Sequence, residues 1–280
     1  MNTFYMRFPG GLERAMTLSY DDGVETDARL IDILDRNGLY ATFNINSGSF
    51  APEGTVYPAG TIHRRMSRSR SLALYTGSRH EVALHASHHP FLERLPLHVA
   101  TREVLCDRME LEQLFGRVVR GMAYPFGTTN DGVVDCLRCC GIVYSRTTVS
   151  THGFNMPQDW LRMPATCHHN DPALFELLDT FLSPLGSNRP PRLFYLWGHS
   201  YEFDGNDNWD RIEKFASLAG GRDDVWYATN IDIYDYTRDY ERLNFSVDCT
   251  IVENPTSREI WFSDAGGNIH SVAPGETKRL

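Results

Sequence analysis

Short apolar runs alternate with longer amphipathic stretches along most of the chain. Runs typical of buried β-strands lie at residues 15–20, 41–45, 81–84, 121–124, 142–145, 161–166, 193–197 and 225–228. Between most of them, apolar residues recur at helical spacing, at 26–37, 98–119, 131–140, 171–182, 208–219 and 232–242. Gly38 and Gly141 follow two of these stretches directly, as expected where a helix ends in left-handed backbone angles.

Strands that alternate with helices favour a parallel sheet, because each helix carries the chain back to the start of the next strand. Up to eight such strands in succession predict a barrel that is closed or nearly closed. We therefore expect an α/β fold, a TIM-like (β/α) barrel of seven or eight parallel strands, with allowance for distortion. Residues 46–80 form an insertion with Gly, Pro and Arg, for which we expect a loop with one short helix over the barrel mouth.

The end of the chain follows a different pattern. Residues 243–280 alternate apolar and polar side chains, and the segments ENPTS (253–257) and DAGGN (264–268) are typical of turns. This pattern predicts three or four short antiparallel strands. We assign residues 1–242 to the barrel, which carries the chemistry, and residues 243–280 to a small β appendage packed on it.

Composition and charge narrow the class of protein. The 280 residues are 41% hydrophobic and 22% charged, which is typical of a globular protein and excludes disorder, coiled coil and collagen. A formal net charge of −9 argues against a nucleic-acid or anionic-membrane partner, because such partners are bound through clustered Lys and Arg. No uncharged apolar run approaches the ~18–20 residues of a membrane span, and no secretory signal is visible, so we expect a cytoplasmic location.

Acids and imidazoles follow the predicted strands with unusual consistency. Barrel enzymes place reactive side chains at the carboxyl ends of their strands, so these groups are expected to converge on one face. The groups that follow strands are Asp21-Asp22-Gly23, His85-Ala86-Ser87-His88-His89, Pro125-Phe126-Gly127, His168-His169-Asn170-Asp171 and Gly198-His199.

This arrangement indicates a cation site. The adjacent carboxylates of Asp21 and Asp22 repel each other, and a divalent cation allows both to remain ionised. His85 and His89 are four residues apart, and with one Asp they make a two-His, one-carboxylate set with open positions for water and substrate. Such an ion polarises a carbonyl and lowers the pKa of bound water, leaving the second Asp as general base. The pattern therefore favours a hydrolase.

Each motif alone has an ordinary structural explanation. Asp-Asp-Gly is a common turn, His-x₃-His occurs by chance on surface helices, and a single His199 after an apolar strand is often a buried, hydrogen-bonded imidazole. The cysteines at 136, 139 and 140 lie in a predicted helix without a second CxxC pair, and we interpret them as buried small side chains. The hydrolase interpretation depends on three polar groups occurring at the same end of different strands.

The order of these motifs resembles the polysaccharide deacetylases, the NodB-homology carbohydrate esterases. The resemblance covers roughly residues 16–240 and rests on SYDDG (19–23), LHASHHP (84–90), AYPFG (123–127), QDW (158–160) and LWGH (196–199). It implies that Asp21 is the general base, that Asp22, His85 and His89 bind the metal, and that His199 protonates the leaving amine. It also implies an oxyanion contact from the backbone N–H of Phe126, and a substrate pocket lined by Tyr124, Leu196 and Trp160.

The chain departs from the family pattern at one position of consequence. Family members commonly carry an Arg at the position of Ala123, where it pairs with the general base. Our hypothesis is that Arg162, two residues after Trp160, supplies this guanidinium from a neighbouring strand. His168 and His169 are outside the common motifs, and they either bind substrate or satisfy loop backbone groups, with Asp171 as a helix cap.

The resulting functional hypothesis is a metal-dependent hydrolase that removes N-acetyl or related acyl groups from an amino sugar, oligosaccharide or glycan. The expected cofactor is one divalent transition-metal ion, with Zn²⁺ the first choice and Co²⁺, Mn²⁺, Ni²⁺ or Fe²⁺ as alternatives. The expected partner is an N-acylated carbohydrate or small amide. Other hypotheses are a hydrolase of another linear amide, a non-catalytic carbohydrate-binding barrel, and a non-haem iron oxygenase using His169, Asp171 and His199.

Overall fold

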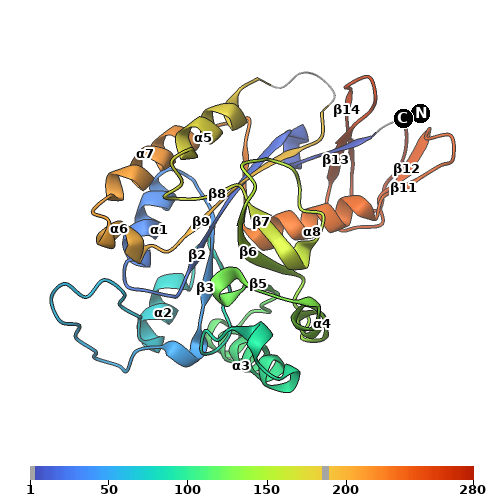
Figure 1. Cartoon of the computed structure of the whole chain (residues 1–280). Helices are drawn as coiled ribbons and strands as arrows, with labels where there is room; N and C mark the ends of the chain where they lie inside the picture. Colours follow the sequence, from blue (N-terminus) through green and yellow to red (C-terminus); the bar gives the residue numbers. More distant parts are fainter. Residues whose placement is uncertain (1–3, 185–188) are drawn as a thin grey trace.

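The fold is built around a parallel sheet. The computed structural model describes residues 4–184 and 189–280. In the central sheet the strands follow the order β7-β6-β5-β4-β3-β2-β9-β8, and β10 pairs with the first part of β2. Helices surround this sheet, and the last strands of the chain extend to one side (Figure 1). The predicted α/β barrel of parallel strands with an antiparallel β appendage is therefore confirmed.

The strands and helices of the barrel have the following bounds. The strands are β2 (Arg14–Asp21), β3 (Ala41–Ile45), β4 (Glu81–Leu84), β5 (Gly121–Ala123), β6 (Tyr144–Ser150), β7 (Met163–Ala165), β8 (Cys167–His168), β9 (Arg192–Gly198) and β10 (Trp226–Tyr227). The helices are α1 (Asp27–Arg36), α2 (Arg68–Tyr75), α3 (Leu97–Phe115), α4 (Asp131–Cys139), α5 (Leu174–Leu182), α6 (Tyr201–Gly205), α7 (Trp209–Ala219) and α8 (Asn230–Glu241).

The barrel closes through a short crossing of the chain. Strand β7 pairs with β6, with Met163 opposite Arg146, and β8 pairs with β9, with Cys167 opposite Leu196. Between β7 and β8 lies the single residue Thr166, so the chain passes from one edge of the sheet to the other within a few residues. The predicted strand 161–166 therefore contains only β7, which follows a 3-10 turn at Trp160–Arg162, and β8 lies just beyond its predicted end, at the other edge of the sheet.

Helix ends follow local backbone chemistry. Helix α3 ends before the predicted residue 119 because Gly116 adopts left-handed angles (φ 63°) and its N–H bonds to Glu112 O. Helix α8 begins two residues earlier than predicted, because Thr229 and Asp232 form a reciprocal capping box. These ends fix where each loop starts, and the loops at one end of the barrel carry the candidate site.

Alternation along the strands separates two environments. On β2, Leu18 and Tyr20 pack in the large apolar cluster between the sheet and the helices. Thr17, Ser19 and Asp21 occupy the other face, inside the barrel, where each has a buried hydrogen-bond partner. The barrel interior is therefore polar near its carboxyl end, which is where the candidate catalytic groups lie.

The appendage consists of two small antiparallel sheets. Its strands are β11 (Asn244–Phe245), β12 (Ile251–Glu253), β13 (Ile260–Ser263), β14 (Ile269–Val272) and β15 (Thr277–Arg279). One sheet has the order β11-β12-β15, and the other has the order β1-β13-β14. Strand β1 (Tyr5–Arg7), which the sequence pattern did not predict, joins the start of the chain to the appendage.

The insertion lies against the mouth of the barrel. It contains a 3-10 turn at Ser47–Ser49 and the short helix α2, whose first turn is capped by the Ser67 side chain. Bridges join Val24 to Arg65 and Ala51 to Ser67, so the loop returns to the end of β2. This placement brings residues of the insertion next to the candidate site.

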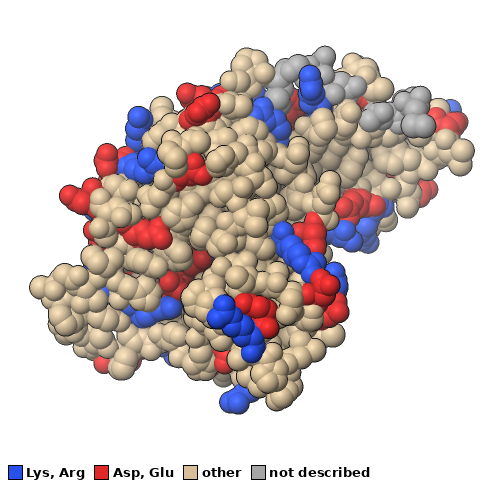
Figure 2. Space-filling view, in the orientation of Figure 1, with Lys and Arg blue, Asp and Glu red and all other residues tan. Residues whose placement is uncertain are grey.

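A membrane-spanning helix or a continuous basic surface would indicate a membrane or nucleic-acid partner. Within residues 4–184 and 189–280, no helix combines the length and the apolar character needed to cross a bilayer. On the face seen in Figure 2, positive and negative groups are interspersed around a broad uncharged area. This face presents no continuous basic area of the kind that binds nucleic acid.

Candidate metal and catalytic site

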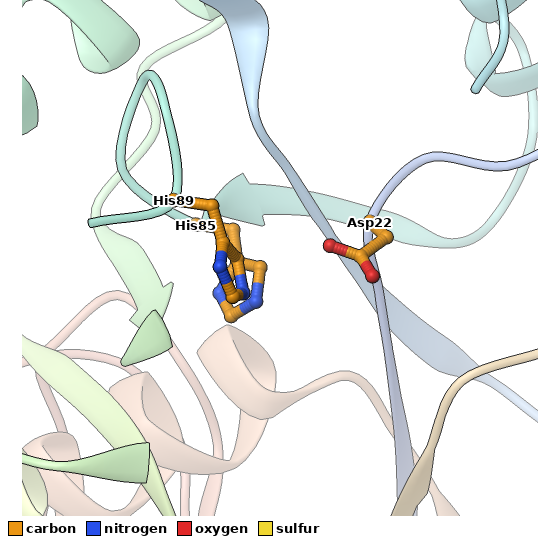
Figure 3. A group of neighbouring side chains, drawn as sticks. All are labelled: Asp22, His85 and His89. Atoms are coloured by element: carbon orange, nitrogen blue, oxygen red, sulfur yellow. The ribbon is translucent and has the colours of Figure 1, made fainter. Parts of the chain in front are cut away.

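Three predicted metal ligands lie together at the barrel mouth. Asp22 follows β2, His85 follows β4, and His89 lies in the next loop (Figure 3). One ligand atom from each residue lies within 4.8 Å of the others. The carboxyl group of Asp22 faces the two imidazole rings (Figure 3). The spacing and the donor types fit one divalent first-row cation.

The backbone at this site adopts unusual angles. Asp22 has φ 87° and His89 has φ 55°, both in the left-handed region that non-glycine residues rarely occupy. Such conformations cost on the order of 1–3 kcal/mol each and cluster at functional sites. The surrounding structure therefore holds these two side chains in positions that the local sequence disfavours.

The two imidazoles are prepared for coordination. The Nδ1 atom of His85 lies 2.8 Å from Ala123 O, which fixes its proton there and leaves the Nε2 lone pair free. Burial lowers the pKa of His85, and burial is also the largest cause that lowers the pKa of His89 to about 4. Both rings are therefore neutral near pH 7, which is the form that binds a cation.

Asp21 is held separately from these ligands. Its Oδ1 accepts a hydrogen bond from Asn44 Nδ2 at 2.8 Å, and its Oδ2 accepts one from the Arg146 guanidinium. Asp21 is 2% exposed. Burial acts to raise its pKa, but the charges of Arg146, His85 and His199 outweigh burial, so the pKa of Asp21 lies below its usual value. Asp21 is therefore an ionised carboxylate near pH 7.

The hypothesis that Arg162 replaces the missing guanidinium is wrong. Arg162 pairs with Asp159 at 2.9 Å and with Asp131, outside the barrel interior. The cation at Asp21 is instead Arg146, which is fully buried and lies directly opposite Ala123 in the pairing of β5 with β6. The guanidinium is thus supplied from the strand next to the one on which the family commonly carries it.

Sequence reasoning missed Arg146, although a signal was present. Arg146 is the first residue after the predicted strand 142–145, and the same rule that selected His85 and His199 selects it. Its Cζ atom lies 4.4 Å from the ring centroid of Trp197, so the guanidinium is also stacked on an aromatic side chain.

His199 faces Asp21 across the interior. Its Nε2 lies 3.8 Å from Asp21 Oδ2, and its Nδ1 lies 3.0 Å from Glu202 Oε1. Burial acts to lower the pKa of His199, but the hydrogen bond to Glu202 and the charges of Asp21 and Asp22 outweigh it, so the pKa is raised. Glu202 was not predicted; it follows His199 by three residues, within the first turn of α6.

His168 and His169 share the other oxygen of Glu202. Their Nε2 atoms lie 3.1 and 2.9 Å from Glu202 Oε2. The Asn170 N–H donates to His168 Nδ1 at 3.1 Å, so the neutral ring carries its proton at Nε2, directed at the carboxylate. A metal-bound imidazole would need that Nε2 lone pair. His168, His169 and Glu202 therefore form a polar cluster in which one ligand atom from each residue lies within 4.8 Å of the others, and the two ring nitrogens of the buried His169 have no hydrogen-bond partner among the described residues.

The predicted iron-oxygenase ligands are not assembled. Asp171 bonds to His152 at 2.7 Å and to the Ala173 N–H at 2.9 Å. His169 and His199 face Glu202 instead. Asp171 therefore has different partners from the two histidines, which share Glu202.

Two predicted pocket residues are fully buried in the described structure. The Tyr124 ring is 1% exposed, and its hydroxyl donates to Leu161 O at 2.8 Å. Leu196 is fully buried in the cluster between sheet and helices. The next residue, Trp197, lies on the same face of β9 as His199, with ring centroids 5.8 Å apart. Trp197, opposite Ser19 of β2, therefore faces the barrel interior, whereas Leu196, which we predicted to line the pocket, packs on the other face of β9.

Phe126 and Trp160, the remaining predicted site residues, both pack against other aromatic side chains. Phe126 is 47% exposed with φ 60°, and its ring stacks on Phe91 at 3.7 Å and meets His89 edge-on at 4.5 Å. The Phe126 ring therefore lies beside the candidate ligand His89. Trp160 packs edge-on against Tyr234 of α8 at 5.2 Å.

Comparisons with known proteins agree with the α/β-barrel fold and with the motifs. The polysaccharide deacetylase family model matches residues 10–145, and the resemblance of this chain to that family is thereby confirmed. A comparison with curated protein sequences found no match.

Solved structures of deacetylases resemble this chain at low sequence identity. Peptidoglycan deacetylase PdaC from Bacillus subtilis is 18% identical, with a TM-score of 0.50 over 82% of this chain and 94% of that chain. The Streptococcus pyogenes deacetylase PplD is 18% identical, with a TM-score of 0.45 over 52% of this chain, which spans 61% of the length of PplD. A carbohydrate esterase family 4 pseudoenzyme from Bacillus anthracis is 16% identical, with a TM-score of 0.48 over 81% of this chain and 67% of that chain. The likeness to PdaC supports the fold alone.

Proposed function

We propose that this protein is a metal-dependent hydrolase that removes N-acetyl or related acyl groups from an amino sugar, oligosaccharide or glycan. The observation that carries the proposal is that two adjacent aspartates have different surroundings. Asp22 faces two neutral imidazoles, whereas Asp21 is buried against Arg146 with its carboxylate ionised. One carboxylate is thus available to a cation and the other to a proton.

The residues that would hold the cation are Asp22, His85 and His89, with Zn²⁺ as the first choice and Co²⁺, Mn²⁺, Ni²⁺ or Fe²⁺ as alternatives. When bound, such an ion polarises the acyl oxygen and makes water more acidic. The free Nε2 of His85 and the strained backbone of Asp22 and His89 support this assignment.

Asp21 acts as the general base. It accepts the proton of the attacking water, while Arg146 and Asn44 keep its carboxylate oriented toward the mouth. The backbone N–H of Phe126 donates to the oxyanion that develops as the acyl carbon becomes tetrahedral. Trp197 covers the guanidinium of Arg146 from inside the barrel.

His199 acts as the general acid. An amide cannot expel its nitrogen as an anion, so a proton must reach that nitrogen before the C–N bond breaks. Glu202 accepts the Nδ1–H of His199 and directs Nε2 into the site. The pKa of His199 is raised by the hydrogen bond to Glu202 and by nearby carboxylates, which favours the protonated ring that a proton donor needs.

We further propose residues 1–242 as the catalytic unit and residues 243–280 as an appendage packed on it. The pairing of β1 with β13 supports close packing, because the start of the chain is then part of an appendage sheet. The proposed substrate is an N-acylated carbohydrate or another small amide.

The test is acetate release from an N-acetylated oligosaccharide by the metal-loaded protein. We expect turnover that a chelator abolishes and that added Zn²⁺ or Co²⁺ restores. Acetate release from a linear N-acetyl amide that contains no sugar would indicate the second substrate class, small amides. Binding of the oligosaccharide without turnover, at any metal, would favour the non-catalytic barrel instead.

A further inference from the structure

Glu202, the partner of the proposed general acid, is contacted at both of its carboxylate oxygens. Oε1 lies 3.0 Å from His199 Nδ1. Oε2 lies 3.1 Å from His168 Nε2 and 2.9 Å from His169 Nε2, and it accepts a hydrogen bond from Asn170 Nδ2 at 3.4 Å. A carboxylate held at one oxygen can still turn about its last side-chain bond, whose torsion has broad minima. Contacts at Oε2 therefore restrict the orientation of the oxygen that faces His199.

His168 presents a donor nitrogen to Glu202. Its Nδ1 accepts the Asn170 backbone N–H at 3.1 Å, so the proton of the neutral ring is on Nε2, 3.1 Å from Oε2. Burial acts to raise the pKa of Glu202, but its contacts with the three imidazoles outweigh burial, so the pKa of Glu202 lies well below its usual value. The donor of His168 thus faces an ionised oxygen, which it attracts.

His169 supports this arrangement from below. Its buried ring stacks on Phe203 of α6, with ring centroids 4.2 Å apart, and lies 4.4 Å from the ring of His168. A Cβ atom placed on Gly198, the residue before His199, would lie 2.0 Å from His169 Nδ1, so the imidazole fills the space that a side chain at position 198 would need. His169 therefore packs between the end of β9, the helix α6 and His168.

We propose that His168, supported by the buried His169, is a positioning residue for the proposed general acid. It holds Oε2 of Glu202 so that Oε1 stays on His199 Nδ1 and the Nε2 atom of His199 stays directed into the site. In the acid step the proton on Nε2 passes to the leaving nitrogen as the C–N bond breaks, and the proton on Nδ1 stays between His199 and Glu202. This inference rests on the proposed function and identifies a residue on which its acid step depends.

Two substitutions of His168 separate positioning from packing. His168→Leu removes the donor, whereas His168→Gln keeps an N–H group on a side chain of similar reach. In His168→Leu, kcat for acetate release should fall by about tenfold, a part of the ~10²–10⁴-fold that acid–base catalysis contributes, with KM unchanged. His168→Gln should recover most of this loss. The matched control is His152→Leu, because His152 also pairs with a carboxylate, Asp171 at 2.7 Å, and it should retain the wild-type kcat. Equal kcat values in wild type and His168→Leu, or equal losses in the Leu and Gln variants, would overturn the proposal.

Proton NMR of the full-length protein with Zn²⁺ added gives a readout that does not require turnover. The hydrogen bond of an imidazole N–H to a carboxylate gives a proton signal far downfield of the amide region. We expect this signal for His199 Nδ1–H, assigned by its loss in His199→Gln, in wild type, His168→Gln and His152→Leu, and we expect it to broaden or vanish in His168→Leu.

The NMR outcomes separate this inference from the proposed function. An unchanged His199 signal in His168→Leu, or no signal in wild type, would refute the positioning role. If the signal behaves as expected but wild-type protein releases no acetate from any N-acetylated substrate, the proposed function fails, while the dependence of the His199–Glu202 hydrogen bond on His168 stands.

Discussion

Two adjacent aspartates in this protein are held by different parts of the molecule. Asp21 ends β2 inside the barrel, and its partners are strand residues, Asn44 on β3 and Arg146 on β6. Asp22 has left-handed backbone angles, and its side-chain partners come from the insertion. The position of the proposed base is therefore fixed by the barrel, and that of the proposed metal ligand depends on a loop. Substitutions in the two regions should have separable effects on turnover and on metal affinity.

The largest effect on turnover is expected for Asp21→Asn. An amide cannot accept the proton of water, so kcat should fall by about 10²–10⁴-fold, the usual contribution of a general base. Metal content should remain near wild type because the ligand set is intact. His85→Ala should lose both turnover and metal. Acetate release and metal analysis on the same samples provide the measurement, and full activity in Asp21→Asn would remove the assignment of the base.

The second-largest effect, on the pH dependence of turnover and on stability, is expected for Arg146→Met. Without the guanidinium, burial dominates and the pKa of Asp21 rises, so the acidic limb of the kcat/KM profile should move to higher pH. Breaking a buried ion pair costs about 3–5 kcal/mol, so the free energy of unfolding should also fall. The loss should be greatest near neutral pH, and it should shrink on acidification, because a protonated Asp21 needs no cation.

A double variant distinguishes pairing from general damage to the barrel. The double variant Asp21→Asn, Arg146→Met has no unpaired carboxylate. Its free energy of unfolding, measured with urea, should therefore be higher than that of the single Arg146→Met variant. An equally unstable double variant would show that Arg146 acts through packing on Trp197 rather than through Asp21.

A smaller effect, confined to the alkaline limb of the pH profile, is expected for Glu202→Gln. His199 must be protonated to act as an acid, so activity should decline as pH rises through its pKa. Removing the charge of Glu202 lowers that pKa, and the alkaline limb should shift to lower pH. Asp264→Asn is the matched control, because Asp264 pairs with His270 in the appendage at the same 3.0 Å distance. Equal profiles for wild type and Glu202→Gln would contradict the role of Glu202.

Sequence patterns predicted the strand-borne part of the molecule better than the loop-borne part. Alternating strands and helices predicted the barrel, and the rule that reactive groups follow strands brought Asp22, His85 and His89 together. Arg146 obeys the same rule, but motif matching directed attention to Arg162. His63, a hydrogen-bond partner of Asp22, lies in an irregular insertion, where no periodicity indicates which residue points at the barrel. Such contacts depend on tertiary packing, and local sequence does not encode them.

Substitutions of the neighbouring residues Leu196 and Trp197 test whether successive side chains of β9 face opposite sides of the sheet, one toward the helices and one toward the barrel interior. Leu196 packs outside the barrel in the main apolar cluster, so Leu196→Ala should cost about 2–5 kcal/mol of unfolding free energy and leave kcat/KM of the folded protein nearly unchanged. Trp197→Leu, one residue along β9, removes the ring between Arg146 and His199 and should lower kcat. Urea unfolding and initial rates on both variants provide the check. The opposite result would be a changed preference for acyl-chain length in Leu196→Ala and an unchanged preference in Trp197→Leu. That result would restore Leu196 as the pocket wall, because a residue that reaches the acyl group alters this preference.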